Sequence, residues 1–192
     1  MTHRRDERAD ERDSRIERWA RHPAGPLLLG FFAILEACLF PAPTEALLAA
    51  LSLARPRRTW HLVASALGGS LLGSLLGYTM GYHAQGNLEW AAAGAQRIEA
   101  IGGRYRDGAF WVLATSGFTP IPYLVYTIAG GAYGVPLLPF ITGALVGRGL
   151  KYLLLGILVR ALGPYLRQAL ARPGWLAGAL LLALAIAYVV LR

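Results

Sequence analysis

Charged side chains inside apolar runs are the best candidates for chemistry in this 192-residue sequence. Glu36 and Arg148 each lie well within such a run, and Glu45 and Lys151 lie close to them along the chain. An ionised side chain near the centre of a bilayer costs about 2.5–3.5 kcal/mol on insertion scales, so each needs a partner or water. A guanidinium binds phosphate through its planar fork, and a carboxylate can carry a proton. These four residues are therefore the predicted binding and transport site.

A purely structural interpretation of the same residues stays open. Glu36 and Arg148 either line a watery cavity or pair with each other, or with freed backbone groups, to hold the fold together. Glu45 follows a proline break, so it either joins the site or interacts with the N-terminal dipole of the helix. Lys151 is one turn beyond Arg148 and either extends a basic stripe or reaches towards the membrane surface.

The composition is that of a membrane protein. Hydrophobic residues make up 55% of the chain and charged residues 16%, whereas soluble domains are about 45–50% apolar and about a quarter charged. Residues 1–24 hold seven basic and six acidic side chains, so the remainder is poorer still in charge. A cytosolic enzyme, a secreted disulfide scaffold and a disordered chain are excluded. The first 20 residues lack the apolar core of a signal peptide, so we expect uncleaved membrane segments.

The sequence shows no pattern typical of a nucleic-acid-binding protein, a metalloprotein or an enzyme. The net charge of +8 comes from basic residues at the ends of apolar runs, not from a patch with aromatics, so nucleic acid is not an expected partner. Cys38 is the only cysteine, which excludes a disulfide framework or thiolate metal site. No serine or cysteine has a recognisable base partner. We expect no enzymatic activity, no cofactor and no metal.

The elements that must position the site are helices of two lengths. Pro41 and Pro43 break one apolar stretch, and Pro120 and Pro122 break another. Each is either a single kinked span or a re-entrant hairpin. The predicted order is a charged tail (1–24), a broken hairpin (27–54), a span (60–83), a connector with a short interfacial helix (84–107), a second broken hairpin (109–134), a span (136–159), a loop (160–172) and a C-terminal span (174–191). Residues 25–172 form the membrane domain.

Glycines recur every fourth residue along the first long span. They therefore line one smooth helix face that another helix can approach closely, and we predict a packing role for Gly69, Gly73, Gly77 and Gly81.

Two broken segments, each followed by a long span, form an internal repeat of the kind found in inverted-repeat transporters. If both broken segments are re-entrant, the tail, residues 55–58 and residues 160–172 share one side and carry seven, three and three arginines, against three in the connector. Positive charge marks the cytoplasmic side. The prediction is an all-α integral membrane protein with two inverted repeats and an extra C-terminal span, in the cell membrane with its N-terminus in the cytoplasm.

Paired motifs over residues 27–160 resemble the DedA family, also called VTT-domain or SNARE-associated membrane proteins, in its YqaA-like branch. The first half carries Glu36-x4-Pro41-x-Pro43-x-Glu45, Ala54-Arg55-Pro56 and the run from Gly69 to Tyr82. The second half carries Thr119-Pro120-Ile121-Pro122-Tyr123, Tyr126-Thr127-Ile128-Ala129-Gly130 and Gly147-Arg148.

The resemblance implies two opposed re-entrant hairpins and the movement of lipids or lipid-linked phosphates such as undecaprenyl phosphate. Glu36 and Glu45 match the family's acidic positions and Arg148 its basic one. The expected function is a flippase or scramblase of anionic lipids, with membrane lipids as partners and protons as a candidate coupling ion. Two alternatives stay open: a non-transporting membrane scaffold that uses the glycine face, and an ion-coupled carrier of small solutes. A homo-oligomer is compatible with either.

Overall fold

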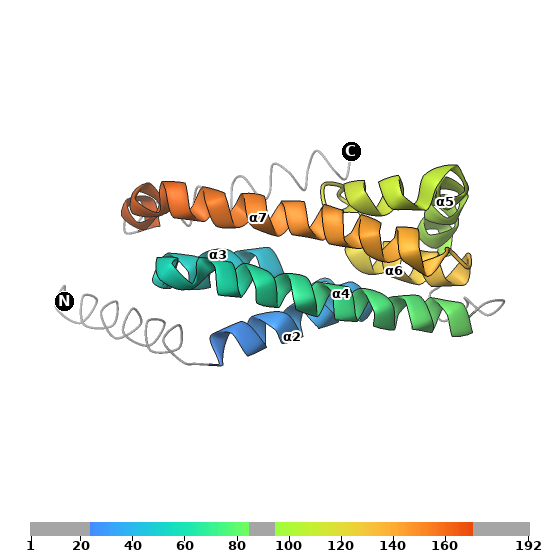
Figure 1. The fold of residues 1–192 in the computed structure, drawn as a ribbon, viewed down its shortest axis with the longest axis horizontal. Coiled ribbons are helices and arrows are strands. Elements are labelled where there is room, and N and C mark those ends of the chain that lie inside the picture. The colour runs from blue at the N-terminus through green and yellow to red at the C-terminus, as the bar shows by residue number, and fades with distance from the viewer. Residues whose placement is uncertain (1–23, 85–94, 171–192) are drawn as a thin grey trace, which may run out of the picture.

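The computed structural model describes residues 24–84 and 95–170 and folds them into helices, which confirms the all-α prediction for this part of the chain (Figure 1). The elements are α2 (Gly25–Cys38), α3 (Thr44–Ala54), the 3-10 turn η1 (Pro56–Arg58), α4 (Thr59–His83), α5 (Ala95–Ser116), α6 (Tyr123–Ala132) and α7 (Leu137–Leu170). The tail up to residue 23 and the predicted span 174–191 lie outside the described residues.

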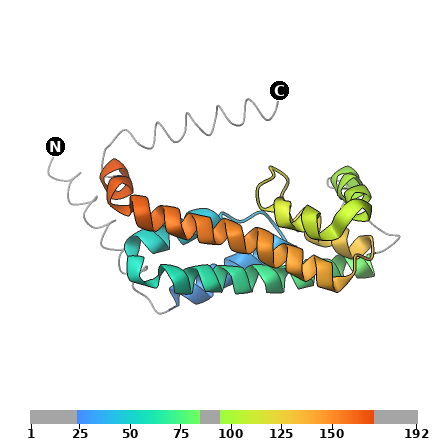
Figure 2. The same cartoon turned by 45° about the horizontal axis from the view of Figure 1, so that its top comes forward.

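The two longest helices, α4 and α7, lie side by side along the molecule and run in opposite directions (Figures 1 and 2). Arg148 of α7 bonds Ser70 of α4, and Gly156, two turns further along α7, lies beside Val63, two turns back along α4. This antiparallel pair is the frame against which the shorter helices pack.

The first proline break separates α2 from α3. Proline has no backbone N–H and disfavours helical geometry in the residue before it, so α2 ends at Cys38 and α3 begins directly after Pro43. Helix α2 lies along α4 in the same direction, with Gly30 against Gly69 and Ile34 against Gly73.

The second proline break separates α5 from α6. Helix α5 is interrupted at Gly108, whose φ of 154° favours glycine, and α6 begins directly after Pro122. The part of α5 after Gly108 lies along α7, with Phe110 against Gly143 and Leu113 against Gly147.

Two sequence predictions need correction. The predicted loop 160–172 is wrong for residues 160–170, which continue α7. The arginines mark the end of the apolar run, but Arg, Ala, Leu and Gln are good helix formers and a single Pro164 does not stop the helix. In the connector, the apolar side chains of Ile98, Ile101 and Tyr105 are buried in the protein core, so this face is not available to a lipid surface.

Within residues 24–84 and 95–170, one stretch of helix, Pro56–His83, is long and apolar enough to cross a membrane on the basis of length and composition.

Candidate functional site

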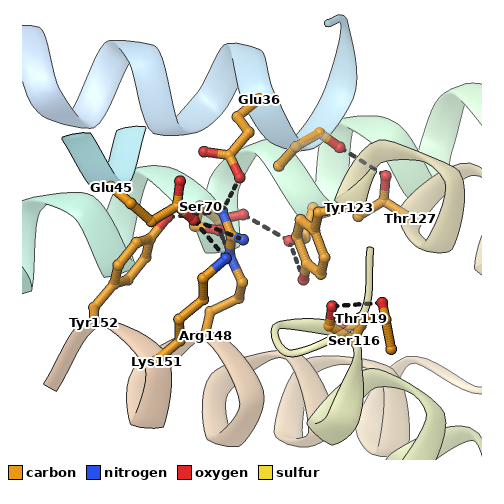
Figure 3. A network of polar contacts seen from close by, with 12 residues as sticks. Glu36, Glu45, Ser70, Ser116, Thr119, Tyr123, Thr127, Arg148, Lys151 and Tyr152 are labelled. Atoms are coloured by element: carbon orange, nitrogen blue, oxygen red, sulfur yellow. Dashed lines mark hydrogen bonds and ion pairs between the residues drawn. The ribbon is translucent and has the colours of Figure 1, made fainter. Parts of the chain in front are cut away.

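The centre of the site is an ion pair between α2 and α7, the first and the last helix that the structure describes. Arg148 Nη2 lies 2.7 Å from Glu36 Oε1, and the two residues are only 1% and 7% exposed (Figure 3). The other carboxylate oxygen of Glu36, Oε2, is buried without a hydrogen bond in the described part of the chain. The structure thus brings together the two residues that the sequence placed in separate apolar runs.

The Arg148 guanidinium is held on several further sides. Its Nε donates to Ser70 Oγ at 2.9 Å, and its Nη2 also donates to the hydroxyl of Tyr152 at 2.7 Å. The ring of Tyr123 lies under the guanidinium, 4.3 Å from its central carbon to the ring centroid, in a cation–π contact. The side chain is therefore fixed by α2, α4, α6 and its own helix.

A second, more exposed pair adjoins the first. Lys151 Nζ lies 2.6 Å from Glu45 Oε1, and their side chains are 30% and 32% exposed. The same Glu45 oxygen is 3.8 Å from Arg148 Nη1, which makes an ion pair but not a hydrogen bond. All four predicted site residues thus lie in one cluster (Figure 3). Glu36 and Arg148 form its buried layer, and Glu45 and Lys151 form its half-exposed layer.

The two proline breaks bring helix N-termini to this cluster. Glu45 is the second residue of α3, and Tyr123 is the first residue of α6. A helix N-terminus carries a partial positive charge and unpaired N–H groups, which attract anions. Because the side chains of Glu45 and Tyr123 both reach Arg148, the first turns of α3 and α6, which follow Pro43 and Pro122, lie near this guanidinium. Pro41, Pro43 and Pro120 are exposed, and Pro122 is partly buried.

Hydrogen bonds from tyrosine and threonine hold the second break in place. Tyr126 shares a hydrogen bond of 2.8 Å with Thr119, and its backbone carbonyl accepts one of 2.7 Å from Tyr105. Burial raises the pKa of Tyr105, so this hydroxyl stays protonated and can donate. Thr127 donates to the carbonyl of Ala37 at 2.7 Å, which ties α6 to the end of α2.

The glycine face of α4 lies against helices of the same chain. A Cβ added at Gly69 or Gly73 would collide with the α2 backbone, one at Gly77 with both Ala37 and Thr127, and one at Gly81 with the α6 backbone. Gly147 has the same role in α7, where a Cβ would collide with the carbonyls of α5. Since α2 and α6 cover the α4 face, it has no room for another protein, which removes the surface proposed for a scaffold.

Sequence reasoning did not identify Ser70, Ser74 and Thr127 as part of the polar network. Ser70 accepts from Arg148, and Ser74 shares a hydrogen bond of 2.9 Å with the hydroxyl of Tyr123. The sequence contained a signal for the two serines, because Ser70 and Ser74 are four residues apart and therefore lie on one side of the helix. Each directly follows a glycine of the packing face. Tyr123 and Tyr152 also belong to the network, because both rings contact the Arg148 guanidinium.

Metal binding has no support in residues 24–84 and 95–170, which contain no group of three or more histidine, cysteine, aspartate or glutamate side chains suited to an ion.

Comparison with known proteins identifies relatives without an assigned activity. The chain is 32% identical over 166 residues to the "Uncharacterized protein HI0703 homolog" of Histophilus somni, covering 82% of this chain and 86% of that protein. It is 27% identical over 166 residues to an "Uncharacterized protein" of Haemophilus influenzae, covering 82% and 85%. No family model and no solved structure matches the chain.

Proposed function

We propose that this chain, which belongs to the family of the HI0703 homolog of Histophilus somni, is a multi-pass membrane protein that moves anionic lipids or lipid-linked phosphates across the bilayer. The observation that carries the proposal is the buried Glu36–Arg148 pair, placed where two proline-broken helices begin. The resemblance of the paired proline motifs to the DedA family supports the same function.

A bilayer would cover the outer faces of the long helices. Large apolar side chains are exposed along both, including Leu72 and Leu76 on α4 and Leu138, Leu153 and Ile157 on α7. Contiguous apolar surface of this kind is unfavourable in water and suits contact with acyl chains. In the proposal α4 and α7 cross the membrane, and the N-terminus lies in the cytoplasm of the cell.

The packing of the two halves supports an inverted repeat. In each half, the helix before a Pro-x-Pro break lies parallel to the long helix that follows, across two glycines four residues apart. These are Gly69 and Gly73 in α4, and Gly143 and Gly147 in α7. Because α4 and α7 are antiparallel, the second half repeats the first in the opposite direction, as expected if the broken segments are hairpins that enter from opposite leaflets.

The site has the chemistry that an anionic headgroup requires. A phosphate inside the membrane needs positive charge and hydrogen-bond donors to offset its lost hydration. Arg148, Lys151 and the N-termini of α3 and α6 supply both. Glu36 and Glu45 neutralise the cations while the site is empty, and protonation of Glu45 would free Lys151 and the outer side of Arg148 for substrate, which gives protons a role as coupling ion.

Lipid movement in liposomes tests the proposal. The purified full chain is reconstituted, and the transfer of labelled anionic lipid or undecaprenyl phosphate between leaflets is followed. We expect Glu36→Gln and Arg148→Ala to lower the rate by about tenfold or more, because each leaves a buried charge unpaired. Glu99→Gln and Arg104→Ala are matched controls on exposed positions of α5 and should keep the wild-type rate.

Folding is checked separately, since loss of a buried partner also destabilises a protein. A Glu36→Leu, Arg148→Leu double variant removes both charges together and avoids an unpaired one, so it should fold yet not move lipid. The proposal is overturned if this folded variant moves lipid at the wild-type rate, or if wild-type liposomes are no faster than empty ones.

A further inference from the structure

We infer that the carboxylate of Glu45 occupies the binding position of the substrate's headgroup anion, and that the headgroup displaces it. The inference rests on the proposed function and adds to it how the site is occupied and which charge it accepts. Glu45 would then be a competitor of the substrate and not one of its ligands.

The first argument is the unused donor of Arg148. In the described part of the chain, its hydrogen bonds come from Nε and Nη2, which bind Ser70, Glu36 and Tyr152. Nη1 faces Glu45 Oε1 at 3.8 Å, beyond hydrogen-bond distance. The guanidinium therefore keeps one nitrogen, with two N–H donors, directed at the half-exposed layer.

The second argument is the difference in burial between the two layers. Glu36 and Arg148 are enclosed, whereas the side chains of Glu45 and Lys151 are about one-third exposed, although Glu45 Oε1 between the two cations is itself buried. An incoming anion can therefore replace the Glu45 carboxylate between Lys151 Nζ and Arg148 Nη1 without separating the buried pair. Glu36 then acts as a positioning residue that holds Arg148 in place.

The third argument is the charge of the cluster. Two glutamates face two cations, so the four charges cancel. Once Glu45 leaves, Glu36 still balances Arg148, and the site has one uncompensated positive charge. A singly charged phosphate restores the balance, so the site suits a phosphodiester monoanion better than a dianionic phosphate monoester.

Equilibrium binding to the purified full chain in zwitterionic detergent tests the inference. The probe is short-chain phosphatidylglycerol, a phosphodiester monoanion, and short-chain phosphatidylcholine is the zwitterionic comparison. We expect Glu45→Gln to tighten phosphatidylglycerol binding by about threefold, because the competing half-exposed ion pair is lost. Lys151→Gln should weaken it by at least as much, and the control Glu99→Gln on α5 should leave it unchanged.

Because Glu45→Gln and Lys151→Gln are expected to change the affinity in opposite directions, the experiment distinguishes displacement of Glu45 by the headgroup from a purely structural Glu45–Lys151 pair. If Glu45 only positions Lys151, or is itself a ligand, Glu45→Gln will weaken binding as Lys151→Gln does, and the inference is overturned. A Glu45→Ala variant checks the result with a second side chain that cannot pair. Unchanged binding in both Glu45 variants overturns the inference as well.

Inorganic phosphate added as a competitor identifies the source of the anion. If it displaces phosphatidylglycerol from Glu45→Gln at millimolar concentration, a free phosphate suffices. If it does not, the site requires the lipid. Transfer of lipid between leaflets is measured independently. If Glu45→Gln tightens binding and Lys151→Gln weakens it, but the wild type moves no lipid, the proposed function is contradicted and the inference about Glu45 is not.

Discussion

The Arg148 side chain combines the properties that make a buried charge tolerable and useful. It is 1% exposed, yet its positive charge meets Glu36 at 2.7 Å and its planar group lies over the ring of Tyr123. Two of its three nitrogens make the hydrogen bonds, and the third faces the outer pair. A flexible ammonium could not satisfy Ser70, Glu36 and Tyr152 from one fixed plane.

Substituting Arg148 by lysine tests whether this geometry matters beyond charge. We expect Arg148→Lys to lower the free energy of unfolding by about 2–3 kcal/mol, because charge-assisted hydrogen bonds contribute about 1.5–3 kcal/mol each and lysine cannot keep all of them. Thermal unfolding in detergent measures the change. Arg104→Lys on the exposed side of α5 should shift stability by less than about 0.5 kcal/mol. Equal stability of the two variants would contradict a geometric role for the guanidinium.

At this scale the sequence indicated which charged residues gather in one cluster better than how they are arranged. Glu36 and Arg148 were identifiable because charge is costly inside an apolar run. Their partners Ser70 and Tyr152 were not, because a serine or tyrosine in such a run is unremarkable until the fold brings an arginine to it. The separation of Glu36 and Arg148 by 112 residues along the chain also gave no reason to prefer a direct pair over two residues that line a watery cavity.

Among the elements, α4 shows how spacing specifies a contact. Four glycines at intervals of four remove every side chain from one face, so α2 and α6 approach until their carbonyls would collide with any added Cβ. Gly68, one residue before the face, has nothing within 4 Å of such a Cβ. The same helix therefore carries glycines of two kinds, required and replaceable.

Alanine substitutions at neighbouring glycines test this distinction. We expect Gly69→Ala to destabilise the fold by about 1–3 kcal/mol, because the methyl group collides with the backbone of Gly30. Gly68→Ala should be neutral or stabilise by up to about 1 kcal/mol, since alanine favours the helix and meets open space. Unfolding in detergent compares the two. A loss of similar size at both positions would mean that helix propensity, and not contact with α2, decides the outcome.

The helix boundaries were predictable where a residue physically stops a helix and not where only charge changes. Pro43 and Pro122 precede the starts of α3 and α6 as expected, because proline breaks backbone hydrogen bonding. The end of α7 was misplaced because Arg160 ends an apolar run without ending the helix. The boundary between the connector (84–107) and the second broken hairpin (109–134) coincides with the interruption of α5 at Gly108, where the sequence turns from polar to apolar.

Over the whole molecule, the two proline breaks approach the middle of the α4–α7 pair from different halves of the chain. Ser70 and Ser74 on α4 bond Arg148 and Tyr123, and Glu45 after the first break pairs with Arg148, so both breaks converge on one level of the long helices. In contrast, η1 and the connector part of α5 lie at opposite ends of α4, as Figures 1 and 2 show. A protein oriented with α4 across a bilayer would thus have its polar site near mid-depth.

Cysteine labelling decides this orientation for the complete chain. Cys38 is buried and is first replaced by alanine, after which Arg57→Cys and Gly103→Cys are made separately. Arg57 lies in η1, and a Cβ at Gly103 meets nothing within 4 Å, so both thiols should be tolerated. With a membrane-impermeant maleimide we expect only the Gly103→Cys protein to react from outside the cell, and both to react after permeabilisation. Reaction of both from the same side of an intact membrane would contradict α4 as a crossing helix, and with it the opposed entry of the two hairpins.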